Sequence, residues 1–360
     1  MYEIIINTSV DVNWEKNLLK SDYANFYQNS QYIESVFGTI PIYISILDDK
    51  QNIVGQLGLN IIQTTVQYSG PIFNYFLKLF SNLSKRGIWL FGPIIHTNNE
   101  QEKIKILQEI FKAVDIICNK YNLIFVKGFY PPYDFLSTDQ ITNEFKNNDY
   151  LISKSITFLA DLTESSDILF NKISRKTRGD ILRGKKRGIS IKEIKRRDEL
   201  QNYIRLHEKW AKTKGLELST SSYDVEKIWN NIQSGLEIFF LAYQNDEIIS
   251  GLRLTQFNNI IYTHSVISSF SKNTSLGGTL LTFNALEWAK KNNFKIYDFS
   301  GGSNENLTEK EKNLLFYKQK WGGEEITHFN MVKIHKKISY KIFTILEFFL
   351  GKYHSYKANN

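Results

Sequence analysis

The sequence is poor in cysteine and lacks long apolar runs. Its one cysteine, Cys118, cannot form an intramolecular disulfide or build a thiolate metal cage. No segment approaches the roughly 20 consecutive apolar residues that a membrane-spanning helix requires. The N-terminal segment contains Glu3 and a short Ile4-Ile5-Ile6 run, which is too brief and too acidic for a signal peptide. These absences together predict a cytoplasmic protein.

Several familiar catalytic signatures are also missing. The sequence has no G-x-S-x-G elbow, no H-E-x-x-H pair and no P-loop. Its six histidines are scattered, and no two of them stand at ligand spacing, so we predict no metal site. His264 falls in an expected strand and is interpreted as a packed or hydrogen-bonded residue rather than a catalytic base. His207, on an expected helix, is a weaker candidate still.

The length and charge of the chain give the first positive indications. With 360 residues and 42% apolar content the chain can build more than one core, and about two domains are expected. The net charge of +8 indicates an anionic partner. Between Lys172 and Arg197 twelve basic residues face only two acids, Asp180 and Glu193. This run is either a solvated helix face or a platform for the phosphates of RNA, a nucleotide or a lipid-linked diphosphate.

Both halves of the chain show the same order of expected elements. In the first half, residues 40–47 and 52–61 are predicted strands, residues 99–120 an amphipathic helix and residues 123–126 a buried strand. In the second half, "EIISGLRL" from Glu247 resembles the earlier "NIVGQLGL", and "LLTFNALEWAKKNNFKIYDF" resembles "ILQEIFKAVDIICNKYNLIFVKGF". The pattern predicts an α/β (α+β) protein with an internal repeat.

The boundary between the halves is expected near residues 147–155, where a polar stretch precedes a new strand at 155–162. We therefore assign residues 1–150 to an N-terminal domain, residues 151–336 to a C-terminal domain, and residues 337–360 to an amphipathic helix and tail. Because no Gly/Ser-rich or Pro-rich linker separates the halves, we expect them to pack tightly.

A basic segment, "LFNKISRKTRGDILRGKKRGISI", is the first of three candidate site motifs. It is predicted to place on one helix, ending near Gly188, the side chains of Lys172, Arg175, Lys176, Arg178 and Arg183. Arg175 and Arg178 lie one turn apart and can bracket a phosphate or carboxylate, for which planar guanidinium groups are well suited.

The second motif is "IYDFSGGSNEN", a strand with Tyr297 and Asp298 that breaks at Gly301-Gly302. Two glycines after a strand allow the backbone to approach a ligand closely, although an ordinary tight turn has the same composition.

The third motif is "LLFYKQKWGGE". Its aromatic–lysine pair, Tyr317 and Lys318, precedes Trp321 and two glycines that are also typical of a helix C-cap.

Taken in order, these motifs resemble the signature of the FemAB family, peptidyltransferase-like enzymes of the GNAT superfamily. The family pattern has a strand ending Tyr-Asp-x-x-Gly-Gly, then a helix with an aromatic–Lys pair, then an aromatic residue followed by Gly. The basic segment resembles the family's helix with its Arg-x-x-Ile step, here Arg178 and Ile181, and "FGPIIHTNNE" fits its Gly-Pro element at Gly92-Pro93.

The resemblance implies two GNAT-like domains with mixed sheets, packed tightly around a shared groove, and transfer of an activated acyl group to an amine. The implied donor is an aminoacyl-tRNA, with no cofactor, and the implied acceptor is an amine of a lipid-linked or nucleotide-linked cell-wall precursor. The implied catalytic residues are Lys318, which stabilises the oxyanion, and Asp298, which either positions the acceptor or is structural. The residues expected to bind substrate are Arg175, Arg178, Tyr297, Gly301, Gly302, Tyr317 and Trp321.

Two features of the sequence leave acyl-CoA as an alternative donor substrate. Residues 197–234 offer two ordinary helices, so the long helical hairpin that some family members are thought to use for tRNA is missing. Ordinary GNAT enzymes hold CoA with an Arg/Gln-x-x-Gly-x-Gly/Ala loop at a helix start. The corresponding segment here, "SKNTSLGGTLL", is a degraded match that offers Lys272, Ser275, Gly277 and Gly278. The alternative function is therefore a CoA-dependent N-acyltransferase acting on an amino sugar or other small amine.

The C-terminal segment "HKKISYKIFTILEFFLGKY" mixes lysines with large apolar residues. Residues 337–350 can lie at an anionic membrane interface, near a lipid-linked acceptor on the inner face of the membrane. The favoured interpretation is a helix packed against the first domain. A third functional class, a non-catalytic module that binds RNA or a membrane surface, uses the same basic and amphipathic features.

Overall fold

The computed structural model describes residues 2–36, 38–63, 84–133, 138–214, 225–269, 274–303 and 307–345. The chain forms two compact units, of which unit 1 comprises Met1–Lys154 and His328–Asn360 and unit 2 comprises Ser155–Thr327. The chain passes into unit 2 within strand β7 (Tyr150–Asp161) and returns to unit 1 within strand β14 (Glu324–Ile334).

Residues 151–154 and 328–336 therefore belong with the first unit, whereas the sequence assigned them to the second. The physical reason is a long-range pairing, because the end of β14 forms an antiparallel ladder with β6 of unit 1. Such a pairing has no local signature in the sequence.

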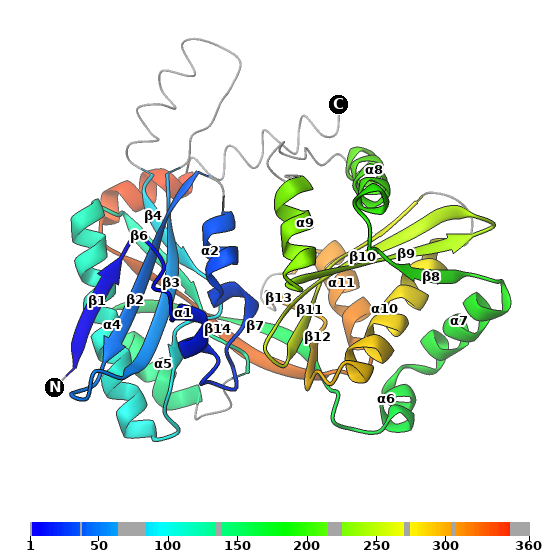
Figure 1. The fold of residues 1–360 in the computed structure, drawn as a ribbon. Coiled ribbons are helices and arrows are strands. Elements are labelled where there is room, and N and C mark those ends of the chain that lie inside the picture. Colours follow the sequence, from blue (N-terminus) through cyan, green and yellow to red (C-terminus); the bar gives the residue numbers. More distant parts are fainter. Residues whose placement is uncertain are drawn as a thin grey trace, which may run out of the picture. The chain divides into compact units, whose positions relative to one another are not determined.

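Unit 1 is a mixed sheet with helices on both faces (Figure 1). Its remaining elements are β1 (Glu3–Asn7), α1 (Trp14–Leu18), η1 (Phe26–Gln28), α2 (Ser30–Ser35), β2 (Thr39–Leu47), β3 (Ile53–Ile62), β4 (Arg86–Trp89), β5 (Ile94–Ile95), α4 (Glu100–Tyr121), β6 (Phe125–Phe129) and α5 (Thr138–Asn147). Two glycines of β3 allow helices to approach opposite faces of the sheet. A Cβ at Gly55 would lie 2.6 Å from Ile106 of α4, and one at Gly58 would lie 2.1 Å from Ile33 of α2.

The strands of unit 2, coloured green to orange in Figure 1, also combine parallel and antiparallel pairs. Its remaining elements are α6 (Ser166–Lys172), α7 (Arg175–Lys186), β8 (Ser190–Glu193), α8 (Arg197–Thr213), α9 (Val225–Gln233), β9 (Glu237–Gln244), β10 (Glu247–Phe257), β11 (Ile260–Ser268), α10 (Thr274–Lys291), β12 (Ile296–Asp298), β13 (Gly302–Ser303) and α11 (Glu309–Gln319). Strand β9 is buried on both faces. Phe240 packs with α10 in one core and Phe239 packs with α8 in the other.

The strands of the two units share one topology. The strand order is β1-β2-β3-β4-β6-β14 in unit 1 and β8-β9-β10-β11-β12-β7 in unit 2. In each, four antiparallel strands are followed by a fifth that is parallel to the fourth, and then by an antiparallel sixth. The parallel pair needs a crossover helix, which is α4 in unit 1 and α10 in unit 2. The predicted internal repeat is thus present as a repeated topology, and the α/β class is confirmed.

Two local boundaries differ from the sequence expectations. The strand expected at 123–126 begins at Phe125, because Asn122 ends α4 in the left-handed conformation and Leu123 N donates to Cys118 O. The single helix expected to begin at Lys172 is two helices. Lys172 ends α6, and Ser174 caps the start of α7 by accepting a hydrogen bond from Thr177 N.

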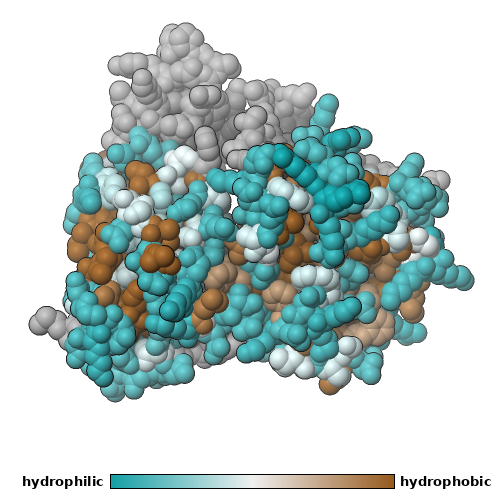
Figure 2. Space-filling view, in the orientation of Figure 1, coloured by the Kyte–Doolittle hydropathy of each residue, from teal (hydrophilic) through white to brown (hydrophobic). Residues whose placement is uncertain are grey.

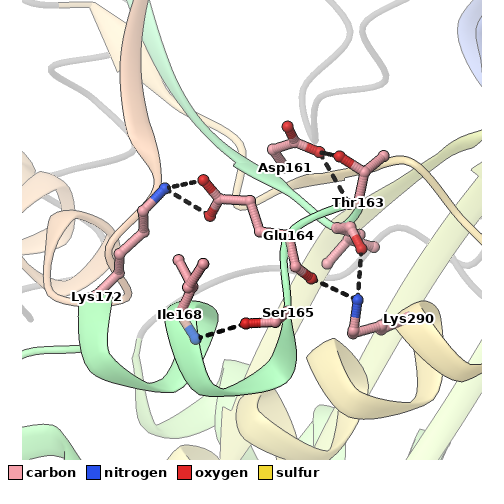
Figure 3. Close-up of polar contacts among 8 residues, drawn as sticks. Asp161, Thr163, Glu164, Ser165, Ile168, Lys172 and Lys290 are labelled. Atoms are coloured by element: carbon pink, nitrogen blue, oxygen red, sulfur yellow. Dashed lines mark hydrogen bonds and ion pairs between the residues drawn. The ribbon is translucent and has the colours of Figure 1, made fainter.

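The segment that enters α6 is fixed by lysines (Figure 3). Lys290, at the C-terminal end of α10, donates hydrogen bonds to Leu162 O at 2.9 Å and Glu164 O at 2.5 Å. Lys172 donates to both carboxylate oxygens of Glu164, at 2.7 and 2.6 Å. The Lys290 contacts join the end of β7 to α10, and the Lys172 contacts join the end of α6 to the segment that precedes it.

The surface in Figure 2 is largely hydrophilic, with apolar residues in small groups. Among the described residues, no helix is both long and apolar enough to cross a membrane. Residues 337–345 are helical, and Phe343 is buried against Ile124 and Phe125 of unit 1. The favoured interpretation of the C-terminal helix is confirmed for this part, while residues 346–350 lie outside the described residues.

Candidate functional site

Unit 2 contains a cavity of about 800 Å³ between β11, α10, α11 and α7. The cavity lies where two parallel strands part. Strands β11 and β12 pair only from Ile260 to Tyr262, and β11 then continues to Ser268 paired with β10 alone. The lining residues are Lys176, Asp180, Arg183, Thr263, His264, Ser265, Val266, Ser268, Ser275, Gly278, Thr279, Thr282, Phe299, Ser300, Leu314, Tyr317, Lys318, Lys320 and Trp321.

The turn after β12 forms one wall of the cavity and is held by Asp298. Its carboxylate oxygen Oδ1 accepts hydrogen bonds from Thr157 Oγ1 at 2.5 Å and from Ser300 N at 2.6 Å. Asp298 is only 2% exposed and does not line the cavity. These contacts show that the Asp298 side chain holds the turn in position, and its expected catalytic role stays a prediction.

The two glycines of this turn differ. A Cβ at Gly301 would lie 1.5 Å from the carbonyl oxygen of Ile156, so this position accepts only glycine. A Cβ at Gly302 would meet nothing within 4 Å, and Gly302 pairs with Ile156 in the short strand β13. The close approach at Gly301 is therefore to the backbone of β7, and the predicted approach of the Gly-Gly motif to a ligand stays a prediction.

Lys318 reaches the same turn from α11. Its Nζ donates a hydrogen bond of 3.2 Å to the carbonyl oxygen of Gly301, and it lines the cavity. Burial lowers the pKa of the Lys318 ammonium from its ordinary value of 10.5, while the Asp298 carboxylate opposes this change. Lys318 is thus a partly desolvated cation that is aimed at a carbonyl oxygen beside an open cavity.

The three aromatic residues named by the sequence take different positions. Tyr297 is fully buried, and its hydroxyl accepts a hydrogen bond from Thr263 Oγ1 at 3.0 Å. Tyr297 therefore contacts a lining residue but does not line the cavity itself. Tyr317 and Trp321 line the cavity directly. Trp321 stacks on Phe299 with an interplanar angle of 16°, which joins the end of α11 to the turn after β12.

Helix α7 presents a different stripe to the cavity from the one expected. Lys176, Asp180 and Arg183, at i, i+4 and i+7, line the cavity. Arg178 instead donates from Nη1 to Asn171 O at 2.6 Å and to Ile173 O at 2.8 Å, which ties α7 to the end of α6. Arg175 is exposed and does not line the cavity.

Lys320 is a further cation at the cavity. Its ammonium lies 4.0 Å from the centre of the Tyr317 ring, an arrangement stabilised by the ring's negative face. Burial lowers the pKa of Lys320; Asp180 opposes this change, and Lys176 adds to it. Lys176 and Arg183 belong to the basic segment of the sequence, but neither they nor Lys320 were among the residues expected to bind substrate. The spacing of Lys176, Asp180 and Arg183 in the sequence indicates that they share one face of a helix. It does not indicate which face of α7 lines the cavity.

The histidines also differ from expectation. His264, interpreted as a packed residue, has an exposed side chain that lines the cavity. His207 lies on α8 as predicted, where it stacks on Trp210. Among the described residues, no group of three or more His, Cys, Asp or Glu side chains is arranged to hold a metal ion.

The "SKNTSLGG" segment falls partly outside the described residues, which resume at Thr274, so Lys272 is not placed. Gly277 serves packing, because a Cβ there would lie 2.7 Å from Ser250 Oγ and 2.9 Å from Ile249 on β10. Gly278 and Ser275 line the cavity. Helix α10 therefore brings its first turns to the cavity, with its glycines divided between packing and lining.

No protein-family model matches the sequence, and no curated protein matches it. Solved structures do match over nearly the whole chain. FemX aligns with 94% of this chain and 99% of its own, with a TM-score of 0.73 at 13% sequence identity. The chain has the fold of FemX.

Two further structures fit this fold assignment. L-PGS from Bacillus licheniformis aligns with 94% of this chain and 96% of its own, with a TM-score of 0.52 at 10% identity. A tandem GNAT protein from the clavulanic acid biosynthesis pathway aligns with 93% of this chain and 98% of its own, with a TM-score of 0.52 at 10% identity. The FemX-like, GNAT-type fold implied by the FemAB resemblance is thus confirmed.

Proposed function

We propose that this chain is an acyltransferase that moves an activated amino acid from a donor bound in the unit 2 cavity to an amine of a cell-envelope precursor. The observation that carries the proposal is the hydrogen bond from Lys318 Nζ to the Gly301 carbonyl. It places a partly desolvated ammonium at the cavity wall with hydrogen-bonding geometry toward a carbonyl oxygen.

Such a cation is what acyl transfer to an amine requires. The amine attacks the ester or thioester carbon, and the carbonyl oxygen becomes an oxyanion. A positioned donor in a low-dielectric site stabilises that charge more in the transition state than in the ground state. An acyl carbonyl bound beside Gly301 would accept a hydrogen bond from Lys318. Because the ester or thioester of the donor is already activated, the reaction requires no covalent enzyme intermediate.

Three further cations of the cavity lining fit the phosphates of the donor. Lys176 and Arg183 come from α7 and Lys320 from the end of α11, and they line the cavity with one carboxylate, Asp180, which is ion-paired with Arg183. Burial lowers the pKa of Lys320, Asp180 opposes this change and Lys176 adds to it, so an anion bound beside the two lysines would be stabilised. The proposed phosphate contacts on α7 thus lie on the stripe beside Arg175 and Arg178.

The donor we favour is an aminoacyl-tRNA, whose 3′-terminal nucleotides carry both an aminoacyl ester and phosphates. The resemblance to the FemAB family and the FemX-like fold support this choice. The alternative donor is acyl-CoA, in which case the first turns of α10, with Ser275 and Gly278, would hold the pyrophosphate. The acceptor we propose is a lipid-linked or nucleotide-linked cell-wall precursor, and for the CoA alternative an amino sugar or other small amine.

A peripheral membrane contact is compatible with a lipid-linked acceptor. On the helix at 337–345, Ile338, Ile342 and Ile345 are exposed while Phe343 is buried, so the helix has an apolar stripe away from its packed side. Lys337 and Lys341 are exposed on the same helix. Weaker flotation of an Ile338→Ser, Ile342→Ser double variant with anionic vesicles would support the contact, and unchanged flotation would refute it.

The experiment that tests the function is label transfer to a cell-wall precursor from a pool of charged tRNA, and in parallel from labelled acetyl-CoA. RNase-sensitive transfer that falls by about 100-fold or more in Lys318→Ala would support aminoacyl transfer with Lys318 at the oxyanion. Transfer from acetyl-CoA alone would support the alternative. Lys176→Ala and Lys320→Ala should raise the KM for the donor. Lys186→Ala, which removes an exposed charge from the same helix outside the cavity, is the matched control.

A further inference from the structure

Helix α7 packs on α10 (Figure 1) and contains two glycines, of which one has a packing reason. A Cβ at Gly184 would lie 2.6 Å from Leu280 of α10, so this glycine allows the two helices to pack closely. A Cβ at Gly179 would meet no atom within 4 Å, and Gly179 does not have a positive φ. A glycine inside a helix destabilises it relative to alanine. No contact in the described chain thus requires a glycine at position 179, although it weakens the helix.

The neighbours of Gly179 on the helix surface are mostly cations. On a helix these neighbours are the residues at i−4, i−3, i+3 and i+4. Here they are Arg175, Lys176, Leu182 and Arg183, and all four are exposed. Lys176 and Arg183 also line the cavity. The open position at Gly179 is therefore bordered by three positive charges and lies beside the stripe of α7 that faces the cavity.

The charges of α7 are unfavourable for the helix by itself. The partial positive charge at a helix N-terminus favours acidic residues in the first turn. The first turn of α7 has no acid and begins with Arg175 and Lys176. Arg183 is ion-paired with Asp180, whereas among the described residues no carboxylate pairs with Arg175 or Lys176. An anionic partner along this face would offset the repulsion among the cations.

A nucleic-acid strand has the chemistry that fits this face. From Arg175 to Arg183 the helix rises about 12 Å. Each strand of a duplex carries one phosphate per about 3.4 Å of helix axis, so successive phosphates can contact Arg175, Lys176 and Arg183. The sugar–phosphate backbone can then approach the helix closely at Gly179, where no side chain intervenes. The pyrophosphate of CoA is too short to contact all three cations in this way.

An anionic membrane surface matches this face less well. Interfacial helices bury a broad apolar face together with their basic residues. Helix α7 exposes one large apolar side chain, Leu182. The glycine at the centre of the face adds no further apolar area, so the charge and shape of the face favour RNA.

We infer that the face of α7 around Gly179 is the docking surface for the RNA strand of the donor, where that strand leaves the cavity. The inference rests on the proposed aminoacyl transfer and extends it, because it assigns a binding surface for the RNA outside the cavity. Arg175, which does not line the cavity, contacts a phosphate there. Gly179 leaves space for the backbone between that phosphate and those held by Lys176 and Arg183.

The test measures the binding of deacylated tRNA to the full chain, independently of transfer, for wild type, Gly179→Ala and Gly179→Leu. Because position 179 is open and both new residues are strong helix formers, both variants should unfold at the wild-type temperature or above it. Gly179→Leu should nevertheless weaken tRNA binding by about 10-fold or more, because its side chain occupies the space of the RNA backbone. Gly179→Ala should weaken binding less.

A second pair of variants tests the charges. Arg175→Ala and Lys186→Ala each remove one exposed cation of α7, and neither residue lines the cavity. Arg175→Ala should lower the tRNA affinity and reduce the slope of log K against log salt concentration by about 0.7 to 0.9. Lys186 lies two turns from Gly179, so Lys186→Ala should keep the wild-type affinity and slope.

The outcomes separate this surface from the proposed function. If Gly179→Leu and Arg175→Ala bind tRNA as wild type does, the docking surface is refuted, and label transfer by wild type would still support the acyltransferase. If wild type binds no tRNA and transfers label from acetyl-CoA alone, the inference also fails while acyl transfer stands. If Gly179→Leu loses binding to phosphatidylglycerol vesicles but not to tRNA, the face contacts a membrane and the inference is wrong.

Discussion

Lys318 and Gly301 lie 17 residues apart in the sequence, and the Nζ of one donates to the carbonyl oxygen of the other at 3.2 Å. This contact joins the two motifs that carry the family resemblance, the Gly-Gly turn after β12 and the aromatic–lysine pair of α11. It also fixes the lysine at the wall of the cavity. The order of the motifs thus reflects a spatial relationship that a short helix, α11, makes possible.

The Gly301 position should be far less tolerant of substitution than Gly302. Gly301→Ala forces a Cβ to within 1.5 Å of the Ile156 carbonyl oxygen, so the turn or β7 must move. We expect a loss of at least about 1–3 kcal/mol of unfolding free energy. Gly302→Ala meets no atom within 4 Å and should change stability by less than about 0.5 kcal/mol. Thermal and urea unfolding of the pair would check this, and equal losses would contradict it.

The pH dependence of transfer should show the lowered pKa of Lys318. Burial favours the neutral amine, so activity that needs the ammonium should decline on the alkaline side at a lower pH than for an ordinary lysine. The arginine of Lys318→Arg keeps its charge throughout. The transfer rate of this variant should therefore be lower than that of wild type but should no longer decline at alkaline pH. If the rate of Lys318→Arg still declines at alkaline pH, another group causes that decline.

The same shift has a defined sign for stability. Between the lowered pKa of folded Lys318 and its ordinary value of 10.5, the unfolded chain binds more protons than the folded chain. The free energy of unfolding contributed by this group therefore rises with pH across that window. Comparing the pH slope of urea unfolding for wild type and Lys318→Met would isolate the contribution, and identical slopes would contradict the shift.

Asp298 should act on the site by holding the turn and by its charge on Lys318. Asp298→Asn retains an oxygen that can accept from Thr157 and Ser300, so the fold should persist. Removing the carboxylate takes away the effect that opposes the lowering of the Lys318 pKa, so the alkaline limb should move to lower pH. Asp298→Ala should cost more stability, about 1–3 kcal/mol, because two donors lose their acceptor. If the transfer rate of Asp298→Asn declines at the same alkaline pH as that of wild type, this explanation is wrong.

A buried ion pair away from the cavity should be important for folding. Glu237 is 2% exposed and accepts hydrogen bonds from Arg253 Nε and Nη2, each at 2.8 Å. Glu237→Ala leaves the guanidinium without its carboxylate and should cost about 3–5 kcal/mol. Glu226→Ala, which breaks an exposed pair with Arg197, should cost less than about 1 kcal/mol. Urea unfolding of both variants checks the contrast, and similar losses would contradict it.

The sequence by itself determined the elements and their order. The apolar spacing of residues 99–120 predicted the helix found at Glu100–Tyr121, because its core-facing side chains recur with the helical period. The same holds for the strand–turn–strand units around residues 40–61 and 238–254, whose β-branched and aromatic runs are buried by the sheet. The signature residues Asp298, Gly301 and Lys318 could be selected because their motifs are local.

The tertiary structure decided what depends on contacts between distant segments. Only the pairing of β14 with β6 shows that residues 328–336 belong to unit 1. Only the packing of α7 on α10, where Gly184 meets Leu280, selects Lys176 and Arg183 rather than Arg175 for the cavity. Likewise, the register between β10 and β11 creates the bulge that turns His264 outward. Periodicity fixes which residues share a face, but the partner that covers each face is set by the whole chain.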